Sequence, residues 1–274
     1  MRTCAVKRMN PDSESQDVGH LELKILRRLG NVHENIVHLI GSKDESELRQ
    51  NFDHSSPAVP MQSRLLILLE FAANGTLFSW MQDNRTRLSH SLYCRWAKEL
   101  SSSVAYIHLH RIIHHDIKPH NILLTESLDL KLADFGNALV VENDEELIDG
   151  LGRGTQTYSA PELLSPQTAY SFPVDVYSVG VTLYTLLTGD EPFCSARSMS
   201  SVQILLAIRQ GFFESGMHQV RRKIVFPASG HEDASPFVAI VKHCVALDPE
   251  ARPTALDLTL DIESAELLTF LHQK

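Results

Sequence analysis

The sequence predicts an α+β fold in which a small, sheet-rich part precedes a larger helical part. Short β-prone runs surround one helical stretch in residues 1–72, whereas longer helical stretches come later in the chain. The length of 274 residues suits one large domain or two smaller lobes that share a cleft.

The composition limits the classes of partner and compartment. Hydrophobic residues make up 43% of the chain, and no apolar run approaches the roughly 20 residues that span a bilayer. The formal charge of −9 argues against nucleic acid, because contact with phosphates needs a basic face. The N-terminus is not a signal peptide, and the cysteines form no CxxC pair, which favours reduced thiols. We expect no nucleic-acid or membrane partner and an intracellular location, in the cytoplasm or nucleus; the oligomeric state is not indicated.

The first part of the chain alternates strand and helix patterns. Residues 3–7 form a short β-prone run that ends in a lysine, and residues 18–29 place apolar side chains at helical spacing. Two further β-prone runs cover residues 35–41 and 65–70. Between them, residues 42–63 are polar and contain prolines, which predicts a long insertion loop.

A polar loop between two apolar runs lies in residues 112–124, after a predicted helix at 93–108. Pro119 restricts the backbone of this loop and of the residue before it. A carboxylate, an amine and an amide are thus held on a short connection between buried segments, which is typical of a catalytic loop. Its polar side chains are those of His114, Asp116, Lys118 and Asn121.

A second motif follows in residues 129–136, where leucines alternate with other residues. The pattern predicts a strand that ends at Asp134, with Gly136 as a turn or hinge. Together the two motifs resemble the catalytic loop and the Asp-Phe-Gly motif of the eukaryotic protein kinase superfamily. The resemblance extends from Cys4 to about Leu260 and implies a two-lobed protein-kinase fold. Residues 1–72 would form a truncated N-terminal lobe, and residues 73–274 would form the helical C-terminal lobe.

The resemblance also implies an activity, which is transfer of the γ-phosphate of ATP to a protein. Lysine two positions after Asp116, followed by proline, resembles the serine/threonine-specific pattern, so a Ser or Thr hydroxyl would be the acceptor. Asp116 would orient this hydroxyl and take its proton, and Lys118 would lie beside the γ-phosphate. Asn121 and Asp134 would bind Mg²⁺, which prefers oxygen ligands.

The same resemblance assigns residues to the ATP site. Lys7 would bind the α- and β-phosphates and Glu22 would position it. Glu70 and Ala72 would contact adenine through backbone groups, with Leu123 beneath the ring.

Three structural pairings are implied as well. Arg252 would pair with the buried Glu162, and the ring of His114 would pack under Phe135. Asp175 would be a buried anchor for the catalytic loop, although an ordinary position at the start of a helix would also explain it.

Two departures from the family pattern leave alternatives open. Only six residues precede Lys7, so the chain lacks the glycine-rich loop that would cover the phosphates, and we expect weaker ATP binding. An incomplete sequence explains this loss, but so does an inactive pseudokinase or scaffold. In addition, His115 replaces an arginine, and residues 137–154 contain no Ser, Thr or Tyr, so we expect no switching by phosphorylation of the activation loop.

A metal site built from histidines is a further alternative. Their spacing fits no zinc motif, and His114 already has a place in the kinase interpretation. The residues concerned are His108, His110, His114, His115 and His120.

Overall fold

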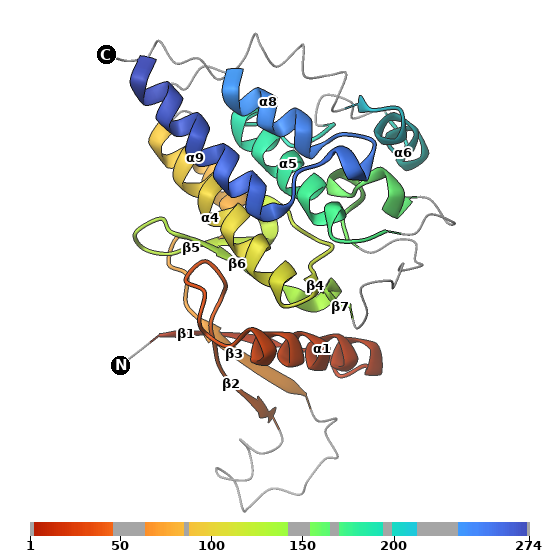
Figure 1. Cartoon of the computed structure of the whole chain (residues 1–274). Coiled ribbons are helices and arrows are strands. Elements are labelled where there is room, and N and C mark those ends of the chain that lie inside the picture. The colour runs from red at the N-terminus through yellow and green to blue at the C-terminus, as the bar shows by residue number, and fades with distance from the viewer. Residues whose placement is uncertain are drawn as a thin grey trace, which may run out of the picture.

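The computed structural model describes residues 3–45, 64–84, 88–141, 154–164, 170–193, 199–212 and 235–272. A small sheet crossed by one helix lies below a larger helical part, as Figure 1 shows. The predicted α+β class is confirmed. Most of the predicted insertion loop, residues 46–63, lies outside the described residues, as do residues 142–153 of the acidic segment.

The small sheet is antiparallel throughout and has the strand order β1-β3-β2. Its strands are β1 (Cys4–Arg8), β2 (Leu39–Asp44) and β3 (Leu65–Glu70). The apolar strand β3 lies in the centre, and its residue Ile67 pairs with Lys7 of β1. The strand expected at 35–41 begins only at Leu39, because Ile36 forms a bridge with Leu132 of the helical part.

One helix, α1 (Ser13–Leu29), packs against this sheet. It begins earlier than the predicted 18–29, because the side chain of Asp12 accepts a hydrogen bond from the backbone N–H of Ser15 and so caps the helix. It ends before Gly30, whose φ of 59° is favourable for glycine. The apolar face of α1 buries Leu23, Ile25, Leu26 and Leu29, and Glu22 lies on the same face.

The larger part is built around two long helices, the first of which the sequence predicts at 93–108. Helix α4 covers His90–Leu109, and α5 covers Pro173–Thr188 with most of its side chains buried. Helix α9 runs antiparallel along α4, and the Thr259 hydroxyl donates to the Ser101 hydroxyl across this interface. The remaining helices are α3 (Leu77–Asp83), α6 (Ser201–Arg209), α8 (Ser235–Cys244) and α9 (Ala255–His272).

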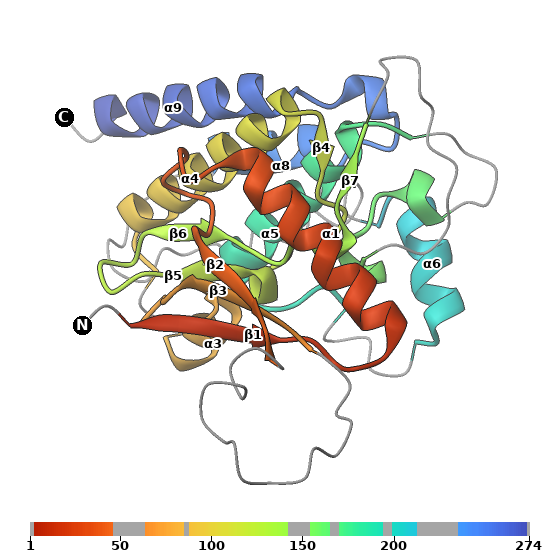
Figure 2. The ribbon, with the colours of Figure 1, turned by 90° about the horizontal axis from the view of Figure 1, so that it is seen from below.

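Short strands and turns lie between α4 and the sheet, where Figure 2 shows them beside α1. Strand β6 ends at Leu132, two residues before the predicted end, because Asp134 has a left-handed backbone with a φ of 62°. The elements there are β4 (Ile112–Ile113) paired with β7 (Leu139–Val140), β5 (Ile122–Leu124) paired with β6 (Leu130–Leu132), and the 3₁₀ turns η1 (Pro119–Asn121) and η2 (Phe135–Asn137). Three further 3₁₀ turns lie elsewhere, against α5 and α6: η3 (Gln156–Tyr158), η4 (Pro161–Leu164) and η5 (Pro249–Ala251).

Three cysteines, Cys4, Cys94 and Cys244, are free thiols, and Cys194 lies outside the described residues. Burial raises the pKa of the Cys244 thiol to about 12, so this group is inert at neutral pH. Within the described ranges, no helix is both long enough and apolar enough to cross a bilayer.

Candidate active site

The loop from His114 to Asn121 gathers its polar groups around one carboxylate. The Asp116 Oδ2 atom accepts hydrogen bonds from Lys118 Nζ and from Asn121 Nδ2, each at 2.8 Å. The Asn121 amide also donates to the backbone oxygen of Asp116 at 2.8 Å. The turn η1 brings Asn121 back toward Asp116, because Pro119 occupies its first position. The structure therefore brings three of the predicted site residues into direct contact.

A fourth group at this site comes from a distant segment. The Thr155 hydroxyl donates to Asp116 Oδ1 at 2.8 Å, and Lys118 Nζ donates to the same hydroxyl at 2.5 Å. Gly154 allows this approach, since its φ is 80° and a Cβ there would overlap the carbonyl oxygen of His115. The sequence analysis did not assign Thr155 to the site. The Gly-Thr pair was the available signal, but nothing in it indicates a contact across 39 residues.

Asp175 holds the start of the loop that carries Asp116. It is fully buried and accepts hydrogen bonds from the backbone N–H groups of His114 at 2.8 Å and His115 at 2.9 Å. The His108 ring donates to it at 3.0 Å. Burial raises the pKa of Asp175, but the hydrogen bond from His108 and the nearby imidazoles outweigh burial and leave it below the ordinary value. The predicted anchor is confirmed, and it fixes a backbone that reaches a φ of 66° at His115.

The ring of His114 connects this loop to the Asp-Phe-Gly segment. Its Nε2 atom donates to the carbonyl oxygen of Ala133 at 3.1 Å, and the ring centroid lies 4.9 Å from that of Phe135. This confirms the expected packing under Phe135. The left-handed turn at Asp134 follows directly, and it directs the Asp134 carboxylate toward Lys7.

Lys7 bridges two carboxylates from different elements. Its Nζ atom lies 2.6 Å from Glu22 Oε2 on α1 and 2.8 Å from Asp134 Oδ1. Burial lowers the pKa of Lys7, but the two carboxylates outweigh burial and raise it above the ordinary value. Burial raises the pKa of Asp134, and the charge of Lys7 outweighs it and lowers that pKa. The Glu22 side chain is 0% exposed, whereas that of Asp134 is 45% exposed.

The residues expected to contact adenine lie at the end of β3, just after it, and in β5. Glu70 ends β3, Ala72 lies in the turn that follows, and Leu123 is half-buried in β5. The side chain of Glu70 also has a structural role that the sequence analysis missed. Its Oε1 atom accepts from the backbone N–H of His38 at 2.7 Å and pairs with Lys131 Nζ at 2.9 Å. One feature of the sequence could have indicated this role, namely Lys131 between the leucines of β6. A buried cation needs an anionic partner, and Glu70 is that partner.

A buried ion pair lies away from these residues. Arg252 Nη1 and Nη2 donate to the two Glu162 carboxylate oxygens at 2.5 and 2.9 Å, which confirms the expected pairing. The guanidinium also donates to the carbonyl oxygens of Ala246 and Pro173, and it lies 5.0 Å from the ring centroid of Tyr177. This pair connects η4 to the segment before α9.

The oxygen atoms of Asn121 and Asp134 fit the needs of a divalent cation. Because the Asn121 amide nitrogen donates to Asp116, its carbonyl oxygen lies on the other side of the amide. Among the described residues, no three His, Cys, Asp or Glu side chains converge as a metal site. The histidines of the alternative metal site instead contact separate partners, namely Asp175 for His108, Tyr106 for His110, Ala133 for His114, Asn137 for His115 and Phe78 for His120.

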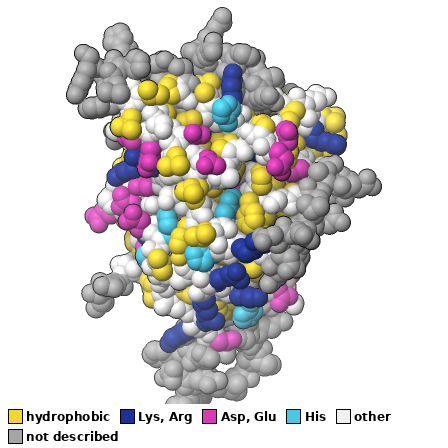
Figure 3. All heavy atoms as spheres, viewed as in Figure 1, with side chains coloured by type: hydrophobic (Ala, Val, Ile, Leu, Met, Phe, Trp, Pro, Cys, Tyr) yellow, Lys and Arg dark blue, Asp and Glu magenta, His cyan; other side chains and the backbone are white. Residues whose placement is uncertain are grey.

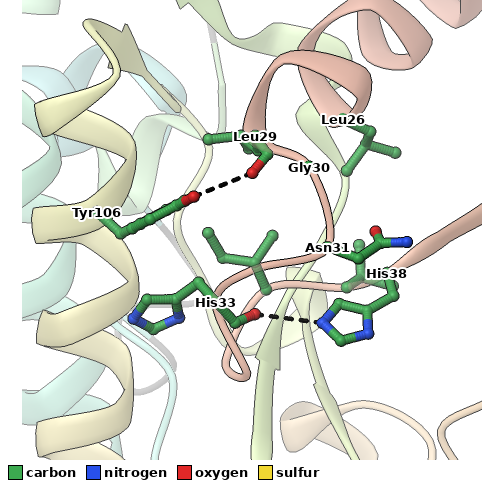
Figure 4. Close-up of a pocket in the computed structure, with 9 residues that line it drawn as sticks. Leu26, Leu29, Gly30, Asn31, His33, His38 and Tyr106 are labelled. Atoms are coloured by element: carbon green, nitrogen blue, oxygen red, sulfur yellow. Dashed lines mark hydrogen bonds between the residues drawn. The ribbon is translucent and has the colours of Figure 1, made fainter.

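A small pocket lies away from these residues, between the end of α1 and helix α4 (Figure 4). The Tyr106 hydroxyl donates to the Leu29 carbonyl oxygen at 3.0 Å on one side, and the His38 ring lies 3.4 Å from the His33 carbonyl oxygen on the other. Its free volume of about 10 Å³ accommodates about one water molecule, so it is no nucleotide site.

Comparison with known proteins identifies the family. Residues 1–261 match the protein kinase domain. Wall-associated receptor kinase 5 of Arabidopsis thaliana is 30% identical over 253 residues, which cover 88% of this chain and 31% of that protein. Calcium/calmodulin-dependent protein kinase type I of Schizosaccharomyces pombe is 30% identical over 262 residues, which cover 92% of this chain and 68% of that protein. The human phosphorylase b kinase gamma catalytic chain, liver/testis isoform, is 28% identical over 257 residues, with coverages of 91% and 55%. The chain spans about a third of the length of the plant receptor kinases it matches.

Proposed function

We propose that this chain, which belongs to the protein kinase family, transfers the γ-phosphate of ATP to a Ser or Thr hydroxyl of a protein substrate. The observation that carries the proposal is the contact of Lys7 with both Glu22 and Asp134 at 2.6 and 2.8 Å. It joins the small sheet, α1 and the Asp-Phe-Gly segment, and a Lys–Glu ion pair of this kind is one of the parts that protein kinases need for phosphoryl transfer. Residues 1–72 and 73–274 would then be the two lobes of the kinase.

In this proposal, Asp116 orients the acceptor hydroxyl and accepts its proton. The hydroxyl of Thr155 already donates to Asp116 and accepts from Lys118, so the site offers a model of how an acceptor hydroxyl is held. Lys118, which contacts both Asp116 and the Thr155 hydroxyl, would supply positive charge beside the γ-phosphate. Such positioning and charge stabilisation are the main contributions that a protein makes to phosphoryl transfer.

The nucleotide would be bound by residues of both lobes. Lys7 would contact the α- and β-phosphates, with Glu22 fixing its position. The backbones of Glu70 and Ala72 would contact adenine, and Leu123 would lie beneath it. Asn121 and Asp134 would supply the protein ligands of Mg²⁺, which neutralises phosphate charge when it is bound.

The serine/threonine assignment rests on Lys118 and its contact with Thr155. Relatives with serine/threonine acceptors are consistent with it, since one is named as a serine/threonine-protein kinase of Saccharomyces cerevisiae. We expect Ser and Thr peptides, and not Tyr peptides, to accept phosphate.

The test is transfer from γ-labelled ATP to Ser, Thr and Tyr peptides, with Asp116→Asn as the matched control. Loss of the base lowers the rate by about 10²- to 10⁴-fold while the fold and nucleotide binding persist. Wild-type chain that binds Mg²⁺–ATP without transferring phosphate would contradict the proposal and support the scaffold alternative. Transfer to Tyr alone would contradict only the acceptor class.

A further inference from the structure

Helix α9 carries apolar side chains on the face that points away from the protein. Leu256, Leu260 and Leu267 are 63%, 54% and 64% exposed. At 3.6 residues per turn, these positions lie within about 40° of one another around the helix axis. We call these three residues the leucine stripe.

The opposite face of α9 is the one that the fold covers. Leu258, Ile262 and Ala265 are buried there, against α4 and α8. A helix that is apolar on both faces is normally buried on both, whereas a single exposed leucine needs no explanation. Across the described residues, nothing covers the leucine stripe. A second layer of protein is therefore expected on this face.

Acidic residues border the leucine stripe. Asp257, Asp261 and Glu263 are exposed, while Glu266 is paired with Lys98 of α4 at 2.7 Å. Figure 3 shows hydrophobic and acidic side chains interspersed over this side of the molecule. A second copy of the chain would place these acidic borders against each other, and an anionic membrane would repel them. The charge therefore favours a basic partner.

We propose that the leucine stripe docks an amphipathic helix of a partner protein, whose apolar face is flanked by Lys and Arg. Such a helix would contact α9 through side chains one or two turns apart, as in other helix-to-helix recognition. The basic flanks would pair with Asp257, Asp261 and Glu263. This proposal does not depend on phosphoryl transfer, because α9 contributes no residue to the candidate active site.

The probe is a labelled amphipathic peptide of about five turns, with leucines at the spacing of the stripe and lysines on both sides. A matched peptide carries glutamates in place of the lysines. Fluorescence anisotropy with the full chain should show the lysine peptide binding at least about tenfold more tightly, with an affinity that falls as salt rises. The triple variant Leu256→Ser, Leu260→Ser, Leu267→Ser should abolish binding.

Two control variants test whether binding depends on the leucine stripe and on its acidic border in particular. The double variant Val202→Ser, Leu206→Ser removes exposed apolar side chains from α6 and should leave binding unchanged. The variant Asp257→Asn, Asp261→Asn, Glu263→Gln should keep the fold, checked by circular dichroism, and lose the preference for lysine over glutamate. Leu260→Asn alone tests the stripe if the triple variant fails to fold.

Four results would overturn the proposal. They are equal affinity for both peptides, unchanged affinity in the stripe variants, no binding of the lysine peptide, and binding to neutral lipid vesicles that the stripe variants lose. Self-association that the stripe variants abolish would assign the face to a second copy of the chain.

Discussion

Arg252 and Lys7 are both cations held by carboxylates, but their surroundings are opposite. Arg252 is buried, forms two parallel hydrogen bonds with Glu162, and uses its remaining donors on backbone carbonyls. Lys7 is 33% exposed and is shared by a buried carboxylate, Glu22, and a half-exposed one, Asp134. One site is closed and neutral, and the other is open and carries an excess negative charge.

The difference separates a structural pair from a functional one. A buried pair whose groups are all satisfied has one favourable arrangement, so it fixes the segments that it joins. A lysine with two acidic partners can exchange one of them for another anion at small cost. The excess charge near Asp134 also suits a divalent cation. We therefore expect mutations to reduce stability most at the first site and to affect ligand binding at the second.

Arg252→Met should produce the largest loss of stability. It leaves the Glu162 carboxylate buried without its partner, which costs about 3–5 kcal/mol in the free energy of unfolding. The double variant Arg252→Met, Glu162→Leu should cost less than the single variant, since no charge remains buried. Urea denaturation measures the free energy of unfolding of the single and of the double variant. A loss under about 1 kcal/mol in the single variant would show that the pair does not hold the fold.

Lys7→Met should have an intermediate effect on stability. Glu22 is fully buried, so removal of Lys7 leaves an ionised carboxylate without a cation and costs about 1–3 kcal/mol. The double variant Lys7→Met, Glu22→Leu should recover most of this loss. No recovery would mean that the lysine stabilises the protein through its aliphatic chain instead.

The loss of unfolding free energy caused by Lys7→Met should also depend on pH. Burial raises the pKa of Glu22 above 4.5, and without Lys7 this shift increases. Between the ordinary and the raised value, the folded variant binds a proton that the unfolded chain does not, so acidification stabilises it. The difference in unfolding free energy between the wild type and Lys7→Met should therefore decrease by about 1 kcal/mol as the pH falls from 8 toward 5. A constant difference in urea denaturation at both pH values would contradict this account.

The sequence predicted those parts of the site that depend on local patterns. Residues Asp116, Lys118 and Asn121 lie within one loop, and Pro119 together with the flanking apolar runs was enough to predict a rigid catalytic loop. The position of Lys7 beside Glu22 followed only from the family resemblance, because a single lysine in a strand has no such meaning by itself.

Contacts set by tertiary packing could not be predicted in this way. The hydroxyl of Thr155 reaches Asp116 because Gly154 packs against the backbone of His115. The pairing of Glu70 with Lys131 depends on how β3 and β6 lie in space. The strand expected at 35–41 shifted for the same reason, because packing against β6 outweighed local β propensity.

Asp134→Asn should change stability least, although it lies at the centre of the proposed chemistry. The Asp134 side chain is 45% exposed, and Lys7 keeps its contact with Glu22, so the free energy of unfolding should change by less than about 0.5 kcal/mol. In a thermal-shift measurement, the stabilisation by Mg²⁺–ATP that we expect for the wild-type chain should disappear, because the proposed metal ligand is lost. Glu126→Gln, an exposed change in the β5–β6 turn, is the matched control for a lost surface charge. If Asp134→Asn retained the full shift with Mg²⁺–ATP, Asp134 would not bind the metal, and the open site would need another explanation for its excess charge.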